Sequence, residues 1–321
     1  MPAALAQSLA IARLAALEAI RRPVFLLVSL SVLAGIALMP LLLNYTLGDS
    51  ARIVRDSALA LAFVGGLLLA ATSSAEAFSR ELRRGTAAVL LAKPVPRAVF
   101  FLAKAAGIAA ALSLYCAASL AATLLAVRAG ASDLRIDWTA ELPALLALLL
   151  APALAGAWNH RTRRPFSSAA FFLLLAFLLL ALAVSAGIET PLDHLAFPDN
   201  VPWPLLRVGL LLSFCLAMVV ALASALATRL AATPVLLLAA GLFLFGLVGD
   251  SLLGPHLSTS LPARAAYALL PNVQAFWLLD ALDAATPIPP AYLALAAAYA
   301  AAWSAAALAL GAASFQTLEI S

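Results

Sequence analysis

The sequence predicts an all-α, polytopic helical integral membrane protein. Hydrophobic residues make up 65% of its 321 positions, whereas soluble domains contain about 45–50%. These residues gather into long blocks, and a bilayer core about 30 Å thick needs about 20 apolar residues in a helix to cross it. Only 11% of the residues are charged, and most of them lie between the blocks. We therefore expect a single transmembrane domain over residues 1–321.

Residues 1–23 are predicted to form a weakly amphipathic helix that lies on the cytosolic leaflet. A plain extension of the first span is the alternative. The following run, Val24–Leu43, is longer than the apolar region of a signal peptide, which covers about 7–15 residues, so we expect an uncleaved span. The apolar face of the first helix would carry Leu5, Leu9, Ala12, Ala16 and Ile20.

Eight apolar segments are expected to cross the membrane. The fourth contains Pro143 and Pro152, which allow it to be irregular. In chain order the segments cover about 24–43, 58–78, 98–127, 140–157, 167–188, 205–227, 234–253 and 291–313.

The loop charges predict the orientation. With a cytoplasmic N-terminus, 13 of the 19 lysines and arginines lie in inner segments and the other six in outer ones. Cytoplasmic loops carry an excess of basic residues. The sequence therefore predicts a multi-pass protein of the plasma membrane (the bacterial cytoplasmic membrane) with both termini in the cytoplasm.

Motifs for chemistry are missing from the sequence. No GxxxxGKS/T, HExxH, GxSxG or CxxC pattern occurs, and His160, His194 and His256 are too scattered for a metal site. Cys116 and Cys215 lie inside apolar runs, as buried packing residues do. The basic residues are separated by apolar runs, which argues against nucleic acid. We therefore expect no catalytic residue, no metal, no cofactor held by this chain and no enzymatic activity of its own.

The span interiors contain almost no ionisable residues, which argues against an ion-coupled carrier. Their polar groups are mild, and most are expected to form hydrogen bonds between packed helices. A weakly polar path between helices is the alternative. These groups include Thr72, Ser73, Ser74, Ser113, Ser119, Thr123, Ser185, Ser213 and Ser224.

The stretch 254–290 is punctuated by prolines and is still apolar, with Tyr267, Phe276 and Trp277. In the predicted orientation it lies on the outer side. A soluble loop would not carry this much apolar surface. We expect interfacial or re-entrant helices packed against the protein, because such an arrangement satisfies the backbone polar groups.

The segment 76–104, between the second and third spans, concentrates the charge of the chain. The second span is predicted to continue into the cytosol as a helix that ends near Arg84, with Gly85 after its last turn. Thr86 would cap a second short helix over 87–92, which Pro94 ends. Pro96 and Arg97 would then begin the third span.

The tip of this element is apolar and surrounded by cations. Val89, Leu90 and Leu91 follow Arg83 and Arg84 and precede Lys93. Exposed apolar residues ringed by charge are typical of a docking surface for a soluble partner. The alternative is that the charges only fix the topology and the leucines lie in the membrane interface.

The residue order of this element resembles the signature of type-2 ATP-binding-cassette (ABC) exporter permeases. Arg80-Glu81-Leu82-Arg83-Arg84-Gly85-Thr86 matches the family's R-E-x-x-x-G-T, and Leu90-Leu91-Ala92-Lys93-Pro94-Val95-Pro96-Arg97 resembles its L-L-x-x-P-V-S-R. Pro96 replaces the usual serine, and Ala103 replaces the glycine before Lys104. Leu270-Pro271-Asn272 resembles the outer re-entrant region, and Phe315-Gln316 resembles the short cytoplasmic ending. Many such permeases have six spans, so eight would be six plus two additional ones.

The resemblance implies a permease subunit that works as a homodimer among membrane lipids, above a pair of cytosolic ABC ATPase subunits that bind ATP and Mg. The element 76–104 and the N-terminal helix would rest on the ATPase. Substrate would leave between the two copies or enter laterally from the inner leaflet. The ATPase-coupling residues would be Arg80, Glu81, Arg84, Gly85, Thr86, Leu90, Leu91, Lys93, Pro94 and Arg97.

Two other functions compete with this one. A non-transporting scaffold or anchoring subunit of a larger complex would keep the docking element and need no path. An intramembrane lipid-modifying enzyme would need buried acids, bases or metal ligands, which are scarce here. The spans offer no charged selectivity group, so lipophilic drugs, lipids, glycans and peptides are all open as substrates.

Overall fold

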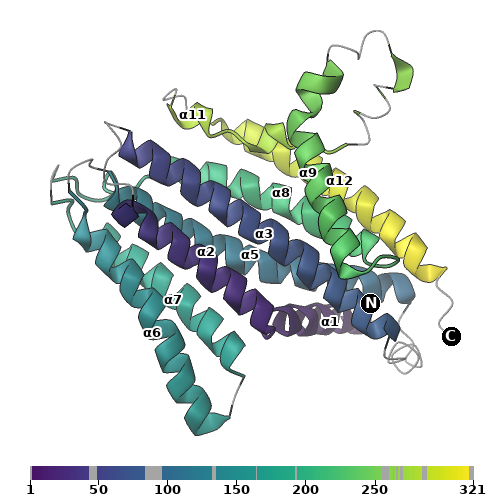
Figure 1. The fold of residues 1–321 in the computed structure, drawn as a ribbon. Helices are drawn as coiled ribbons and strands as arrows, with labels where there is room; N and C mark the ends of the chain where they lie inside the picture. The colour runs from purple at the N-terminus through teal and green to yellow at the C-terminus, as the bar shows by residue number, and fades with distance from the viewer. Residues whose placement is uncertain are drawn as a thin grey trace. The chain divides into compact units, whose positions relative to one another are not determined.

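The protein is all-α and polytopic in the part of the chain that the computed structural model describes (Figure 1). The described residues are 2–42, 49–83, 96–131, 135–163, 165–191, 194–254 and 260–317, without 263, 265–266, 268–269 and 284–287. Within them, eight helices are long and apolar enough to cross a membrane. The predicted fold class is thereby confirmed.

The spans follow one another in the predicted order. A further helix, α1 (Pro2–Ile20), precedes them, and a 3-10 turn η2 (Gln274–Phe276) and the short α11 (Asp280–Asp283) precede the last one. The eight candidate spans lie in α2 (Pro23–Leu42), α3 (Ser50–Arg83), α5 (Arg97–Ala129), α6 (Trp138–Thr162), α7 (Phe166–Ala186), α8 (Pro204–Leu226), α9 (Ala232–Leu253) and α12 (Pro290–Gln316).

Two of these helices differ from their predicted segments. Helix α3 begins at Ser50, well before the predicted start at residue 58. The prediction began later because the first turns carry Arg52, Arg55 and Asp56 and therefore lack an apolar signal. Side-chain contacts support these turns, as the Arg55 Nε donates to Asp56 Oδ1 at 2.8 Å. Helix α6 is continuous through both of its prolines, which membrane helices tolerate when neighbouring groups satisfy the freed carbonyls.

The chain forms two compact units. Unit 1 comprises Met1–Ala16, Leu67–Ala110 and Leu210–Ser321. Unit 2 comprises Leu17–Gly66 and Ala111–Gly209. Helices α1, α3, α5 and α8 contribute residues to both.

In unit 2, α6 and α7 form a helical hairpin that packs on α2 (Figure 1). Phe25 of α2 meets the edge of Phe171 of α7, with ring centroids 5.1 Å apart. Close approach of α2, α3 and α5 depends on Gly65, since a Cβ there would lie 2.5 Å from both Val32 and the Tyr115 hydroxyl. That hydroxyl donates to the Ala62 carbonyl oxygen at 2.8 Å.

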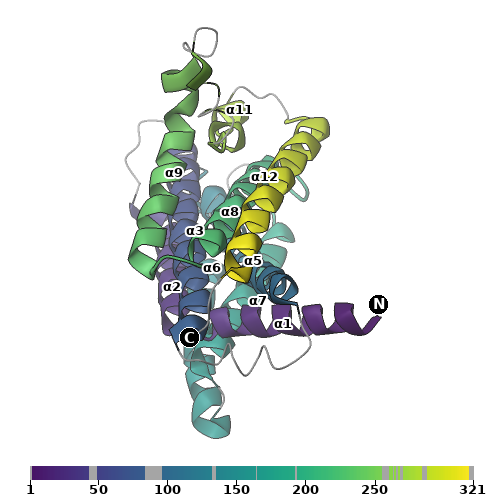
Figure 2. The same cartoon turned by 90° about the vertical axis from the view of Figure 1, so that its right-hand side faces the viewer.

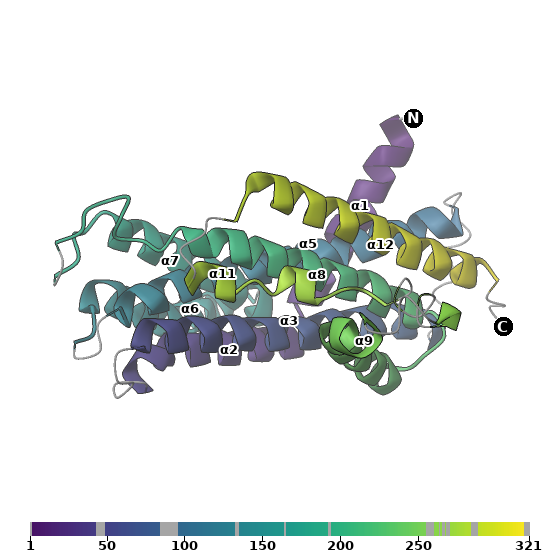
Figure 3. The same ribbon diagram turned by 90° about the horizontal axis from the view of Figure 1, so that it is seen from above.

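In unit 1, α8 and α12 lie side by side (Figure 3). A Cβ at Gly311 of α12 would lie 2.9 Å from the Ala225 Cα of α8, so the two backbones touch. Small residues permit such contacts between membrane helices. The Ser224 hydroxyl of α8 also donates to the Ser74 Oγ of α3 at 3.2 Å.

Residues 273–276, within the stretch 254–290 for which interfacial or re-entrant helices are predicted, contact α9 and α12. The Val273 amide donates to the Gly246 carbonyl oxygen of α9 at 3.3 Å. Tyr292 of α12 donates its hydroxyl to the Ala275 carbonyl oxygen at 2.7 Å. Phe276 is fully buried. Residues 273–276 therefore pack against two helices, α9 and α12. Helix α9 runs crosswise to α12 (Figures 1 and 3).

Candidate functional site

Most of the predicted coupling residues lie outside the described residues. Arg80 and Glu81 belong to the last turns of α3, but their side chains are outside the described part. Arg97 is the predicted coupling residue whose side chain the structure describes. The remaining residues, and the predicted short helix over 87–92, fall in the segment 84–95, which is not described: Arg84, Gly85, Thr86, Leu90, Leu91, Lys93 and Pro94.

Arg97 joins the start of α5 to the end of α12. Its Nη1 donates to the Gln316 carbonyl oxygen at 3.2 Å. The last carbonyls of a helix have no partner within that helix and carry partial negative charge, so a cation is favourable there. Helix α5 begins at Arg97, directly after Pro96, whose carbonyl oxygen accepts from the Phe100 amide at 3.1 Å.

A second arginine binds the same end of α12. Arg229 follows α8, and its Nε donates to the Ser314 Oγ at 3.0 Å. Its Nη2 donates to the Thr317 Oγ1 at 2.8 Å. Two cations, one at the start of α5 and one after the end of α8, therefore bind the end of α12.

Phenylalanines pack beneath these polar contacts. Phe101 of α5 lies between Phe78 of α3 and Phe315 of α12, with centroid distances of 5.1 Å and 5.9 Å. Lys104 is 3% exposed, and its Nζ lies 5.6 Å from the Phe78 centroid and 5.7 Å from that of Phe100. These distances are in the range of a cation–π interaction, which gains strength away from water.

The N-terminal helix rests on the first half of α5. A Cβ at Gly107 would lie 2.2 Å from the Ala12 carbonyl oxygen, so α1 touches the α5 backbone there. Figure 2 shows α1 crossing α5. Ala15 is buried, while Leu5 and Leu9 are 75% and 71% exposed. Part of the predicted apolar face of α1 is thus left uncovered.

These contacts form one packed base in unit 1, which we call the α5 base: Phe78, Arg97, Phe100, Phe101, Lys104, Gly107, Arg229 and the 311–317 end of α12. It joins α1, α3, α5, α8 and α12 at the point where the chain enters and leaves the segment 84–95. Because its residues join several helices, a displacement at the start of α5 would also affect α1, α3 and α12.

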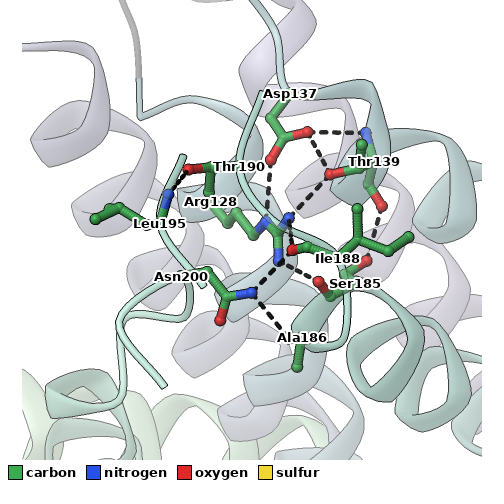
Figure 4. A network of polar contacts seen from close by, with 9 residues as sticks. All are labelled: Arg128, Asp137, Thr139, Ser185, Ala186, Ile188, Thr190, Leu195 and Asn200. Atoms are coloured by element: carbon green, nitrogen blue, oxygen red, sulfur yellow. Dashed lines mark hydrogen bonds and ion pairs between the residues drawn. The ribbon is translucent and has the colours of Figure 1, made fainter. Parts of the chain in front are cut away.

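A buried polar network lies in unit 2 (Figure 4). Arg128, near the end of α5, donates from Nε to Asp137 Oδ2 at 3.0 Å. Asp137 is the N-cap of α6 and accepts from the Thr139 amide at 2.9 Å through Oδ1. A side-chain acceptor satisfies one of the free amides of a helix N-terminus. One carboxylate therefore joins the end of α5 to the start of α6.

The same network closes the end of α7. Arg128 donates to the carbonyl oxygens of Ser185 and Ile188. Asn200 donates through Nδ2 to the carbonyl oxygens of Ala186 and Ile188 at 2.8 Å and 2.9 Å. Carbonyls at the end of a helix need partners from outside it. The buried arginine and asparagine supply them.

The loop charges predict only an outer position for Arg128 and Asp137 and do not indicate that the two side chains bind each other. The sequence does contain a local signal for the N-cap. Asp137 precedes a long apolar run, and Thr139 lies two residues after Asp137, as in a capped helix N-terminus. The partners on α7 and at Asn200 are distant in sequence and carry no such signal.

Comparison with known proteins finds no matching family model and no matching curated protein.

Proposed function

We propose that this chain is the membrane-spanning permease subunit of an ATP-driven exporter, energised by a separate cytosolic ABC ATPase. Eight apolar helices support a permease. Their interiors carry few charges, which argues against ion coupling. The residue order from Arg80 to Arg97 resembles the ATPase-docking signature of such permeases.

The observation that carries the proposal is the α5 base. A docking segment works as a coupling element only if its ends are fixed to the helices that must move. Arg97 binds the end of α12 directly, and α5 packs on α1 through Gly107. A displacement of the segment 84–95 by an ATPase would then reach α1, α5 and α12 together.

In this proposal a second copy of the chain completes the permease, and the ATPase subunits bind ATP and Mg. The termini and the segment 84–95 face the cytoplasm. The N-terminal helix contributes to the same docking surface, because residues 1–16 belong to unit 1 with the α5 base. Substrate leaves between the two copies or enters from the inner leaflet.

The test is co-purification followed by ATPase assay in liposomes. The tagged chain is isolated from its native membrane, and the cytosolic ATPase that accompanies it is identified. We expect Glu81→Ala and Gly85→Val to lower either ATPase binding or stimulated ATP hydrolysis about tenfold, a typical size for coupling between sites. Binding and hydrolysis at wild-type level in both variants would refute the coupling role.

Arg161→Ala is the matched control. Arg161 is exposed at the end of α6, and the predicted topology places it on the same side of the membrane. If Arg161→Ala lowered ATP hydrolysis equally, the charges of 76–104 would act only on topology. Normal assembly with no transport of any tested substrate would instead favour a scaffold.

A further inference from the structure

Unit 2 contains a cavity of about 190 Å³ beside the polar network. Its walls come from the end of α5 and the connection to α6, and from the connection between α7 and α8. Ala51, at the start of α3, closes one side. The cavity is bounded by both signs of charge, as its lining includes Arg128, Arg135, Asp137 and Asp199.

The inner wall of the cavity is buried, and its two charged side chains already pair with each other. Arg128 and Asp137 are 4% and 6% exposed, and they bind each other. Asn200, also in the wall, is 4% exposed. Figure 4 shows its amide nitrogen turned toward Ala186 and Ile188 and its oxygen turned away from them. That buried oxygen has no hydrogen-bond partner among the described residues, although buried acceptors nearly always have one.

The outer wall carries two free charges. Arg135 and Asp199 are both exposed and both line the cavity. Neither side chain makes an ion pair or hydrogen bond within the described part of the chain. A ligand that matches these groups has an anionic group for Arg135 and a hydrogen-donating cation for Asp199. A primary ammonium suits Asp199, and it also supplies the donor that Asn200 lacks.

The size of the cavity and its position relative to the membrane narrow the choice among ligands that carry both an anionic and a cationic group. At about 30 Å³ per water molecule the cavity holds about six waters, which is less than a drug-sized site of about 300–1,000 Å³. Its walls connect α5 to α6 and α7 to α8, all of them candidate spans. Connections between spans come after each helix has left the hydrocarbon core, on the side of the headgroup region. The cavity therefore has the size, charge and depth of a small headgroup site.

We propose that this cavity binds phosphoethanolamine, as the headgroup of a membrane phospholipid. The phosphate pairs with Arg135, and the ammonium donates to Asp199 and Asn200. The Arg128–Asp137 pair holds the wall in place and does not contact the ligand as a binding group. This site is independent of the proposed transport function and needs no ATPase.

The test is calorimetric titration of the purified full chain in detergent micelles. The probes are short-chain phosphatidylethanolamine, short-chain phosphatidylcholine and free phosphoethanolamine. We expect the first to bind about tenfold more tightly than the second, because a trimethylammonium group cannot donate hydrogen bonds and charge-assisted hydrogen bonds are roughly twice as strong as neutral ones. Binding of free phosphoethanolamine with the same variant dependence would identify a soluble source of the ligand, and its absence would identify the lipid.

Two variants and one control make the result specific. Asp199→Asn should abolish the preference for ethanolamine over choline. Arg135→Gln should weaken both lipids about tenfold, because both carry the phosphate. Glu189→Gln removes an exposed charge next to Thr190 without touching the cavity lining and should change nothing. Equal affinity for the two lipids in the wild-type chain, or wild-type binding in both cavity variants, would mean that the cavity holds only water.

Discussion

Two acidic residues near the start of α6 occupy opposite situations. Asp137 is buried and bonded to Arg128 and Thr139. Glu141 is 1% exposed, and neither of its carboxyl oxygens has a hydrogen-bond partner among the described residues. A buried charge is tolerated when paired and costly when alone. The two residues should therefore respond in opposite ways to loss of their charge.

Asp137→Asn should strongly destabilise the protein. Asparagine still caps a helix, so the substitution isolates the loss of charge beside the buried Arg128. Removing one partner of a buried pair costs about 3–5 kcal/mol. Thermal unfolding in detergent measures the effect, with Glu189→Gln as the control for loss of an exposed acid. Equal unfolding temperatures for these two variants would show that the pair contributes little.

Glu141→Gln should leave the unfolding temperature unchanged or raise it. Glutamine has nearly the same shape and removes the possibility of an unpaired buried charge, which costs far more than a neutral amide. The same unfolding measurement applies, and Asp137→Asn is the direct comparison. A loss of stability as large as that of Asp137→Asn would indicate that Glu141 has a charged partner in another chain or ligand.

At the scale of helices, two contacts in unit 1 decide how elements hold together. Helix α1 depends on one glycine, and the end of α12 depends on two arginines. Both features belong to the α5 base. Each can be tested in the isolated chain, without an ATPase.

Gly107→Ala should detach α1 from α5. The new Cβ would lie 2.2 Å from the Ala12 carbonyl oxygen and 2.8 Å from the Ala15 Cβ, so the helices must separate. Faster amide exchange over residues 5–16 measures this. Gly156→Ala in α6 is the control, because nothing lies within 4 Å of its Cβ position. That substitution should stabilise its helix by up to about 1 kcal/mol. Unchanged exchange in α1 would show that α1 and α5 do not pack through Gly107.

Arg229→Ala should loosen the last turn of α12. It removes the bonds to Ser314 and Thr317, and each hydrogen bond contributes about 0.5–1.5 kcal/mol net. We expect amide exchange over 312–317 to accelerate about tenfold, and further when Arg97→Ala is added. Arg161→Ala again controls for loss of an exposed arginine. If amide exchange over 312–317 stays at the wild-type rate in the double variant, the two arginines do not hold the end of α12, and α12 does not belong to the α5 base.

At the scale of the whole molecule, the sequence predicted the eight spans closely because span length and hydrophobicity follow directly from bilayer thickness. The predicted start of α3, at about residue 58, lies after the observed start at Ser50, because the first turns of this helix are polar. The contacts of Arg128 with α7 and of Arg229 with α12 could not be predicted, because they join residues 57 and 85 positions apart that no local pattern relates. The contact of α1 with Gly107 depends on close approach of the two backbones, and a sequence rich in alanine does not show where that approach occurs.

The number of spans makes a final prediction about topology. Eight crossings would place both termini on one side of the membrane, and the excess of basic residues predicts that this side is the cytoplasmic one. In a background with Cys116→Ala and Cys215→Ala, single cysteines are introduced as Gln7→Cys, Thr317→Cys and Glu189→Cys. A membrane-impermeant maleimide added to intact cells should label the third and not the first two, which should react only after permeabilisation. Labelling of Gln7→Cys and Thr317→Cys from opposite sides would require an odd number of spans. The assignment of α9 as a span would then be the first to reconsider, because α9 runs crosswise to α12 within the same unit (Figures 1 and 3).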